Sequence, residues 1–387
     1  MNFQRSQLMK QFPKAIFGDL KAAANRAKAQ GQTLIDLSLG SPDLPPHPLV
    51  RETLSTAAAL PDSYGYTLGG IDAFHEAVAR YYKRRVDVTL DPASEVLQTI
   101  GSQEGLVHLP LAFCNPGDIV LTTDPGYVAY EAGIRLAKAE AYYMPLTAEH
   151  HYLPDLNAIP PHIAQRATLL ILNLPGNPVP AMPSLQYFNE VVAFAKKYNI
   201  IVLHDAAYSE FYFEGDAPMS FLQAEGAKDV GMETNSLSKS FSLAGARIAY
   251  LVGNADMLDV LRALKSNLDY GIFEPIQRAA VTALDHAEMI TDTLRQTFKV
   301  RHTLLREGLT NLGWDVAPSS GGMFLYAKYP LQQFDDVAFA YHLIEQTGIV
   351  VVPGSAFGKN GAQHVRIALV QPESVLQEAL ERLQTLV

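Results

Sequence analysis

Short apolar runs alternate with longer segments of helical spacing along much of this chain, and that alternation limits the folds it can adopt. Residues 104–113 and 184–198 repeat apolar side chains with the period of a helix. The apolar runs that read as buried strands are residues 94–101, 118–124, 167–173, 200–205 and 247–253. Such alternation is typical of βα units around a mainly parallel sheet, so the sequence predicts an α/β fold.

The length of the chain predicts more than one lobe. A chain of 387 residues exceeds the size at which one hydrophobic core usually stops growing. After about residue 285 the pattern changes to a long helical stretch, residues 287–313, and then to short apolar segments. We therefore expect a large domain over residues 46–284, a small C-terminal domain over 285–387, and an N-terminal segment, 1–45, that packs with the small domain.

Composition excludes several classes of function. The formal net charge of −10 argues against a general affinity for nucleic acid or for an anionic membrane surface. The N-terminus lacks the apolar core of a secretory signal, and no apolar run approaches the roughly 18 to 20 residues that span a bilayer. The single cysteine, Cys114, cannot form an internal disulfide, and no Cys/His cluster has zinc-ligand spacing. We expect a cytoplasmic protein without a metal site.

Polar residues follow four of the predicted strands. In open α/β sheets ligands bind at the carboxyl ends of the strands, so these residues are expected to converge on one cleft. They are Ser102 and Gln103, residues 124–127, residues 173–177 and residues 205–208.

One lysine, Lys239, stands among serines with no carboxylate nearby in the sequence. A loop lysine is ordinarily a solvated charge, but Ser236, Ser238 and Arg247 are groups that hold a phosphate dianion. The strand-to-helix turn at residues 102–103 would add backbone N–H groups and the positive end of a helix. Desolvation and a nearby cation lower the pKa of a lysine, which leaves a free amine able to form a Schiff base.

The segment "SLSKSFSLAGAR" resembles the lysine signature of the class I and II aminotransferases, fold-type I enzymes that use pyridoxal 5′-phosphate. Six further blocks resemble this family, in its order and over essentially the whole chain: "SLGSPDLPPHP", "YTLGGIDAFHEAVARYY", "GSQEG", "NPGDIVLTTDPGYVAY", "HDAAYSEFYF" and "HVRIAL". The resemblance implies a large domain with a mainly parallel seven-stranded sheet sandwiched by helices, a smaller α+β domain, and a homodimer.

The resemblance also implies roles around the cofactor. Lys239 would hold pyridoxal phosphate as an internal aldimine and then move a proton from the substrate Cα as general base and acid. Asp205 would keep the pyridine nitrogen protonated, which makes the cofactor an electron sink. Tyr208 and Asn177 would hydrogen-bond the ring hydroxyl, and Tyr127 would stack on the ring.

Other residues are assigned to the substrate and to the subunit interface. Arg366 resembles the family arginine that binds the substrate α-carboxylate, with Gly40 and Asn177 beside it. Phe17, Met323 and Phe324 are expected to line a partly apolar pocket. A tyrosine of the partner subunit would reach the cofactor phosphate, and Tyr66 is preferred over Tyr64.

One block departs from the usual family form. In "NLPGNPVPAMP" the residues Gly176, Val179 and Pro180 replace three of the usual ones, while Asn177 survives. Because proline fixes φ near −65°, where the usual glycine allows positive values, we expect a loop of different shape beside the pocket.

The resemblance therefore implies an aminotransferase that moves the amino group of an L-amino acid to a 2-oxo acid, 2-oxoglutarate or pyruvate, by a ping-pong mechanism. The subgroup resembled is that of LL-diaminopimelate aminotransferases and their aspartate- and alanine-using relatives. Two alternatives stay open. One is a pyridoxal-phosphate-dependent C–S β-lyase, which would release pyruvate and ammonia without an acceptor. The other is a non-enzymatic regulatory module that keeps the fold.

Overall fold

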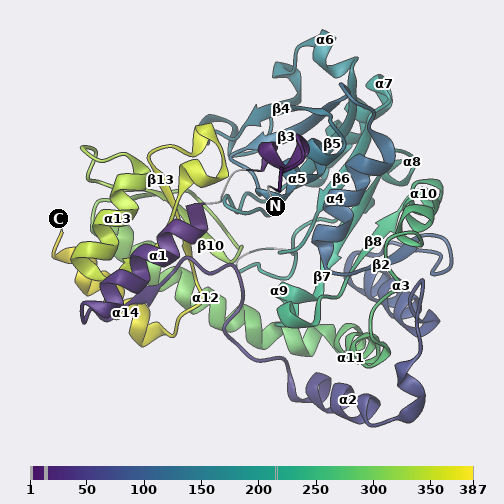
Figure 1. The fold of residues 1–387 in the computed structure, drawn as a ribbon, viewed down its shortest axis with the longest axis horizontal. Helices are drawn as coiled ribbons and strands as arrows, with labels where there is room; N and C mark the ends of the chain where they lie inside the picture. The colour runs from purple at the N-terminus through teal and green to yellow at the C-terminus, as the bar shows by residue number, and fades with distance from the viewer. Residues whose placement is uncertain (1–2, 13–15, 214, 216, 387) are drawn as a thin grey trace.

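A seven-stranded sheet forms the centre of the larger lobe (Figure 1). The structure is a computed structural model that describes residues 3–12, 16–213, 215 and 217–386. All neighbouring strands of this sheet are parallel except β8, which is antiparallel to both of its neighbours. In spatial order the strands are β2 (Val96–Thr99), β8 (Ala249–Gly253), β7 (Gly231–Ser236), β6 (Ile201–Asp205), β5 (Ala167–Asn173), β3 (Ile119–Asp124) and β4 (Glu140–Pro145). The predicted mainly parallel sheet is confirmed.

Helices cover both faces of this sheet because successive side chains of a strand point to opposite faces. On one face Leu169, Ile171 and Leu203 pack with α4 (Ser102–Phe113), α5 (Ala129–Leu136) and α10 (Ala255–Lys265). On the other face the strands pack with α3 (Asp72–Val86), α7 (Leu185–Tyr198), α8 (Ala227–Val230) and α11 (Glu274–Asp285). The remaining helices of this part are α2 (Pro48–Ala58), α6 (Pro161–Ala164) and α9 (Leu237–Ser240).

A second core lies in the lobe on the left of Figure 1. Its antiparallel sheet runs β12 (Val352–Pro353), β13 (His364–Ala368), β10 (Phe324–Lys328), β9 (Asp315–Val316). Its helices are α1 (Ile16–Ala29), α12 (Ala287–Asn311), α13 (Asp336–Thr347) and α14 (Glu373–Gln384). The N-terminal segment joins this core through α1 and through β1 (Ile35–Asp36), which pairs in parallel with β11 (Ile349–Val350). The domain boundaries at 45 and 284 stay a prediction.

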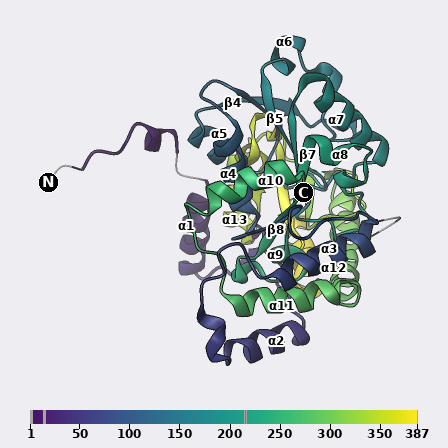
Figure 2. The same ribbon diagram turned by 90° about the vertical axis from the view of Figure 1, so that its right-hand side faces the viewer.

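Short 3-10 helices connect these elements. They are η1 (Leu8–Gln11), η2 (Pro61–Tyr64), η3 (Ala148–His150), η4 (Leu156–Ala158), η5 (Phe221–Gln223), η6 (Ala244–Ala246), η7 (Gly354–Phe357) and η8 (Lys359–Gly361). In Figure 2 residues 3–12, which include η1, extend away from the body of the molecule.

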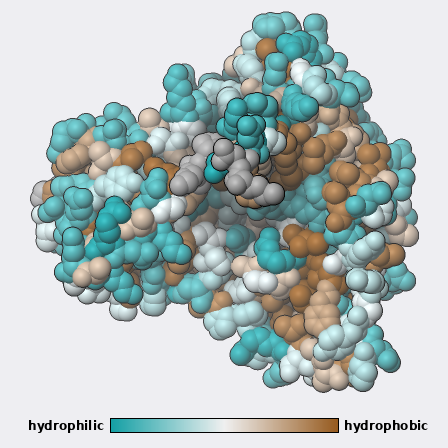
Figure 3. Space-filling model, in the orientation of Figure 1, coloured by the Kyte–Doolittle hydropathy of each residue, from teal (hydrophilic) through white to brown (hydrophobic). Residues whose placement is uncertain are grey.

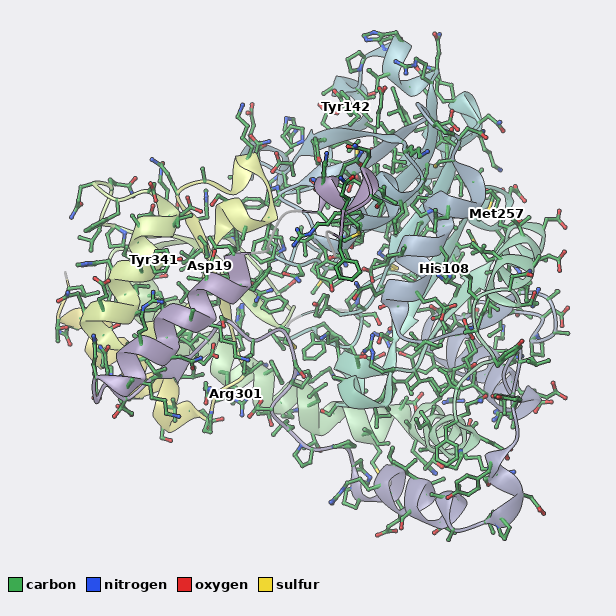
Figure 4. All side chains as sticks on the ribbon, viewed as in Figure 1. Asp19, His108, Tyr142, Met257, Arg301 and Tyr341 are labelled. Atoms are coloured by element: carbon green, nitrogen blue, oxygen red, sulfur yellow. The ribbon has the colours of Figure 1, made fainter. Side chains whose placement is uncertain are left out.

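An ion pair between distant segments fixes the N-terminal segment on the smaller lobe. Arg301 of α12, labelled in Figure 4, donates to both carboxylate oxygens of Asp43 at 2.7 and 3.0 Å and to the Leu369 carbonyl at 3.0 Å. This two-pronged contact is the strong geometry for an arginine and a carboxylate. It holds the chain just beyond Gly40, a predicted substrate residue.

Two strands of the large sheet were not predicted, for opposite reasons. β4 lies at the sheet edge and exposes much of its surface, and its apolar run, residues 141–144, is short and contains two tyrosines. β7, with the sequence GMETNS, is buried throughout although it is polar. Its polar side chains are hydrogen-bonded inside the protein: Glu233 to His204, Thr234 to the Tyr250 carbonyl and Asn235 to Ser209. Burial without a hydrogen-bond partner would be costly, so these partners make the polar strand possible.

Candidate active site

A cavity of about 640 Å³ lies where β5 and β6 end, between the two lobes and against α1. The predicted site residues that line it are Phe17, Gly40, Ser102, Tyr127, Asn177, Asp205, Tyr208, Lys239 and Arg366. The rule that ligands bind at the carboxyl ends of parallel strands therefore located this cavity.

Lys239 is held in the cavity by the short helix α9. The hydroxyl of Ser236 accepts the N–H of Ser238 at 3.1 Å and so caps this turn. The Lys239 amine donates to the main-chain carbonyl of Gly40. Burial lowers the pKa of Lys239 to about 8, and the cations Arg247 and Arg366 act in the same direction, against the opposing charge of Asp205. The two causes predicted from the sequence, desolvation and Arg247, are both present.

Asp205 ends β6 and is buried. Its side chain accepts the Tyr130 hydroxyl at 2.9 Å and the Ala207 N–H at 3.3 Å, and its carbonyl accepts the Asn173 amide at 2.8 Å. Burial raises the pKa of Asp205, opposed by the hydrogen bonds from Tyr130 and Ala207 and by the nearby cations. A carboxylate has about four acceptor positions, so Asp205 can accept a further donor from the cavity. A cationic N–H there would relieve the cost of burying the charge.

Arg366 points from β13 into the cavity with part of its guanidinium unsatisfied. One terminal nitrogen donates to Asn177 Oδ1 at 3.0 Å, and the other donates to the Ser38 carbonyl. The rings of Phe324 and Phe357 lie 4.3 and 5.0 Å from the guanidinium carbon. Burial lowers the pKa of Arg366 to about 10, and its Nε has no hydrogen-bond partner among the described residues. Each terminal nitrogen carries a second N–H, so this fixed planar cation is suited to a carboxylate.

The start of α4 forms an anion-binding point. Gly101 precedes the helix with φ of 71°, and a Cβ built on it would lie 2.2 Å from a terminal nitrogen of Arg247. The Arg247 guanidinium therefore lies against the main chain beside Ser102. The first N–H groups of a helix have no partner within it, and they favour negative charge. A phosphate fits this combination of free N–H groups and a guanidinium.

Several predicted residues do not line the cavity. Tyr66 is 83% exposed and its ring packs 5.1 Å from that of Tyr270, whereas the Tyr64 hydroxyl donates to the Ala58 carbonyl. Asp124 was expected in the cleft because it ends a predicted strand. Its side chain instead accepts the main-chain and side-chain N–H groups of Asn360. The other predicted cofactor residues outside the lining are Gln103, Ser236, Ser238 and Arg247.

The expectation that Met323 and Phe324 line the pocket is wrong. Both side chains are fully buried in the core of the smaller lobe. The ring of Phe324 packs against the guanidinium of Arg366, so Phe324 supports a cavity residue without lining the cavity itself. Phe17 does line the cavity, and its ring meets that of Phe357 edge to face.

The unusual loop after β5 packs against the smaller lobe. Asn177 donates its main-chain N–H to Asn173 Oδ1 at 2.8 Å, and Gly176 donates to the Val179 carbonyl at 3.1 Å. Val179 packs in a small cluster of buried side chains with Leu146, Ala317 and Tyr326. Pro180 sits against Gly322, where an added Cβ would lie 2.4 Å from the Pro180 Cβ. The residues that depart from the family form thus connect this loop to the C-terminal part.

Sequence reasoning missed Tyr130 and the cationic wall of the cavity. Tyr130 follows Tyr127 by three residues at the start of α5, so helical spacing was a signal that both approach the same site. Lys21, Asn25 and Lys28 line the cavity from α1. Their placement depends on the pairing of the N-terminal segment with residues 349–350, for which the sequence carries no local signal.

Metal and membrane features are not found in the described ranges. No group of three or more His, Cys, Asp or Glu side chains there is placed to hold a metal ion. None of the helices described for this chain is both long and apolar enough to cross a bilayer.

The mainly parallel seven-stranded sheet and a buried amine beside an aspartate and an arginine define a fold-type I, pyridoxal-phosphate-dependent enzyme. The model of the family "Aminotransferase class I and II" matches residues 32–383. The chain belongs to this family, and it is an aminotransferase that depends on pyridoxal phosphate.

Individual relatives agree with this assignment. The chain is 39% identical over 382 residues to an LL-diaminopimelate aminotransferase of Moorella thermoacetica, covering 98% of each chain. It is 40% identical over 386 residues to an enzyme of the same name from Aquifex aeolicus, covering 99% of each chain. Among solved structures, substrate-bound BacF of Bacillus subtilis is similar with a TM-score of 0.94 at 36% identity, covering 100% of this chain and 98% of that one.

Proposed function

We propose that this aminotransferase moves the amino group of an L-amino acid to a 2-oxo acid by a ping-pong mechanism, with a donor whose side chain ends in a charged group. The observation that supports it most directly is that the amine of Lys239 shares one cavity with Asp205 and Arg366. Pyridoxal phosphate, when bound, supplies the electron sink and carries the amino group between the two half-reactions.

Residues in and beside the cavity are suited to different parts of the cofactor. The N–H groups at Ser102 and Gln103, the hydroxyls of Ser236 and Ser238, and the Arg247 guanidinium would hold the phosphate. Asp205 would face the ring nitrogen. Tyr127 would lie on the ring. Asn177 and Tyr208, which both line the cavity, would reach the ring hydroxyl.

Lys239 and Arg366 would act on different groups of the substrate. Arg366 would bind the α-carboxylate through the remaining N–H groups of its terminal nitrogens and so orient the Cα–H bond toward the Lys239 amine. Gly40 lies between them, because its carbonyl accepts from Lys239 and its Cα side faces Arg366. As a neutral amine, Lys239 would take the proton from the substrate Cα and pass it to the bound cofactor within the same half-reaction. In the second half-reaction it would move a proton the opposite way, onto the Cα of the new amino acid.

A homodimer completes the site in this proposal. Tyr66 of a second copy would reach the cofactor phosphate, since its own side chain is exposed and outside the cavity of its own subunit. Apolar side chains gather on the right of the face in Figure 3, and Tyr66, Leu68, Leu268 and Tyr270 are exposed. We expect a dimer by light scattering. A monomer that is fully active would contradict this assignment of Tyr66.

The outer wall of the cavity indicates the class of donor. Lys21 and Lys28 line it from α1 and make no ion pair within the part of the chain that the structure describes. Asp36 also lines the cavity, and its Oδ1 accepts the N–H and the hydroxyl of Ser38. Two ammonium groups and one carboxylate suit a side chain that carries a distal carboxylate with or without a distal amine, as in diaminopimelate or aspartate. The names of the Moorella and Aquifex relatives agree with this class.

A panel of L-amino acids, each with 2-oxoglutarate or pyruvate as acceptor, tests the proposal. We expect turnover with dicarboxylic or diaminodicarboxylic donors and a lower KM for them than for alanine. In the variant Lys21→Ala/Lys28→Ala the KM for these donors should rise about threefold to tenfold, because exposed charge pairs are individually weak. Raised salt should reduce the difference.

The control is Lys299→Ala on α12, which removes a lysine outside the cavity lining. It should leave every KM unchanged. Equal effects of the α1 variant on alanine and on dicarboxylic donors would refute the assigned donor class. Release of pyruvate and ammonia without any acceptor would replace transamination by the β-lyase alternative.

A further inference from the structure

A buried histidine lies behind the active site, next to Asp205 on β6 but on the other face of the sheet. His204 is completely buried, and its strand register places it directly beside Glu233 of β7. Its Nδ1 lies 2.8 Å from Glu233 Oε2, and its Nε2 lies 2.8 Å from the main-chain carbonyl oxygen of Leu174. Neither the predicted site nor the proposed mechanism uses this residue.

The partners of His204 assign a proton to each of its nitrogens. A carbonyl oxygen only accepts, so Nε2 must carry a proton to bond Leu174. Glu233 accepts the Tyr82 hydroxyl at 2.6 Å, the Ser220 hydroxyl at 2.8 Å and the Phe221 N–H at 2.9 Å. Burial raises the pKa of Glu233, but these bonds and the one from His204 outweigh it and leave that pKa lowered. Glu233 is therefore a carboxylate, and Nδ1 also donates. His204 is an imidazolium paired with Glu233.

The bond to Leu174 connects this ion pair to the active site. Leu174 begins the loop that carries Asn177, and Asn177 holds Arg366 at 3.0 Å. Asn173, just before Leu174, receives the Asn177 N–H and donates its own amide to the Asp205 carbonyl. The base of the loop is thus held from two sides, by Asn173 within the cavity wall and by His204 from behind the sheet.

We propose that His204 is a positioning residue: its imidazolium, anchored by Glu233, fixes the main chain at Leu174 and thereby places Asn177 against the substrate-binding arginine. The inference rests on the proposed role of Arg366. A charged donor makes the stronger class of hydrogen bond, and an internal charge pair with all its partners satisfied is stable in a dry core. The cationic ring also lies one residue from Asp205 and favours its ionised form.

Two variants separate the two bonds of the ring. His204→Asn keeps an amide near the Nδ1 position, within reach of Glu233, and loses the donor to Leu174. His204→Gln has the longer side chain needed to reach the Leu174 carbonyl. Both remove the same positive charge. Tyr82→Phe is the matched control, because it weakens the same buried ion pair from the other side without touching Leu174.

The first readout is amide hydrogen exchange of the apo protein, which does not depend on activity. In His204→Asn we expect the amides of Gly176 and Asn177 to exchange about tenfold or more faster, the effect of losing one charged hydrogen bond. His204→Gln should recover most of the protection. Tyr82→Phe should lower Tm while leaving these two amides unchanged. Unchanged exchange at Gly176 and Asn177 in a folded His204→Asn protein would overturn the proposal.

The second readout is steady-state kinetics of the holoenzyme. His204→Asn should raise the KM for the amino donor about tenfold with a smaller change in kcat, because Arg366 loses its support through Asn177. Faster exchange without any change in KM would support the contact between His204 and the loop but refute its effect on Arg366. The two parts of the proposal can therefore fail separately. A lower Tm with neither change would reduce His204 to a core residue.

A third measurement needs no folded variant at position 204. In wild-type protein labelled with 15N-histidine, His204 should give two ring N–H resonances, because both of its nitrogens lie 2.8 Å from oxygen atoms that only accept. Spectra of Tyr82→Phe identify these resonances, because that substitution changes the hydrogen bonding of Glu233. A single ring N–H, as in a neutral tautomer, would overturn the proposal.

Discussion

Replacing Lys239 with alanine is expected to lower kcat for transamination by at least about 10⁴-fold while the protein keeps its fold. The substitution removes both the nucleophile that would bind the cofactor and the base that would move the Cα proton. The fold should survive because the side chain points into a cavity, and its one hydrogen bond among the described residues is to the Gly40 carbonyl. Single-turnover kinetics measure the loss, and circular dichroism with thermal unfolding measures the fold.

Lys239→Arg separates the amine from its charge. It keeps a cation beside Asp205, but a guanidinium stays protonated and cannot serve as the base. We expect it to be as inactive as the alanine variant. A small primary amine added to Lys239→Ala should restore part of the rate by supplying the missing base. Activity above about one hundredth of wild type in either variant would place the catalytic amine elsewhere.

The pH dependence of cofactor loading follows from the same residue. Because burial and nearby cations lower the pKa of Lys239 to about 8, the ammonium form predominates below that pH and the neutral amine above it. Only the neutral amine attacks an aldehyde. The rate at which apo protein reacts with pyridoxal phosphate should therefore rise with pH up to about 8 and then level off. A rate that still rises steeply two units higher would show that Lys239 keeps its ordinary pKa.

The fold was predictable where burial and composition agree. Runs such as residues 167–173 are apolar because both of their faces are covered by helices, so composition alone indicated β5. β7 was missed because its Glu233 and Asn235 are polar and yet buried, with partners on distant segments. A single sequence carries no local signal for such partners. The antiparallel direction of β8 was likewise not predicted, since it depends on how the chain crosses the sheet.

The candidate site was predictable to the extent that it lies at strand ends. Topology alone put Asp205 and Asn177 on the list of cleft residues, and the cavity contains both. Arg366 came from resemblance, because its place depends on how the smaller lobe packs against the sheet. His204 could not be found from the sequence, since its role depends on Glu233 and Leu174, which meet it only after the strands pair. The sequence did not reveal the contacts between residues of different strands, helices and loops.

Replacing Asp205 with asparagine is expected to lower kcat by at least about a hundredfold. In the proposed site this carboxylate keeps the ring nitrogen protonated, and the charge it provides is largest in effect where water is excluded. Asparagine has nearly the same size, so the bonds from Tyr130 and Ala207 can persist while the charge is lost. Steady-state kinetics measure the rate, and titration of apo protein with pyridoxal phosphate measures the cofactor affinity, which should also fall.

A graded series distinguishes the charge of Asp205 from its packing. Tyr130→Phe removes one hydrogen bond and leaves the carboxylate, so it should weaken activity far less than Asp205→Asn. Asp205→Glu keeps the charge on a longer side chain and should retain more activity than asparagine. This order follows only if the negative charge itself acts on the ring nitrogen. If Asp205→Asn stays within about twofold of wild type in both kcat and cofactor affinity, the ring nitrogen does not face this residue, because losing a charged hydrogen bond has a larger effect than that.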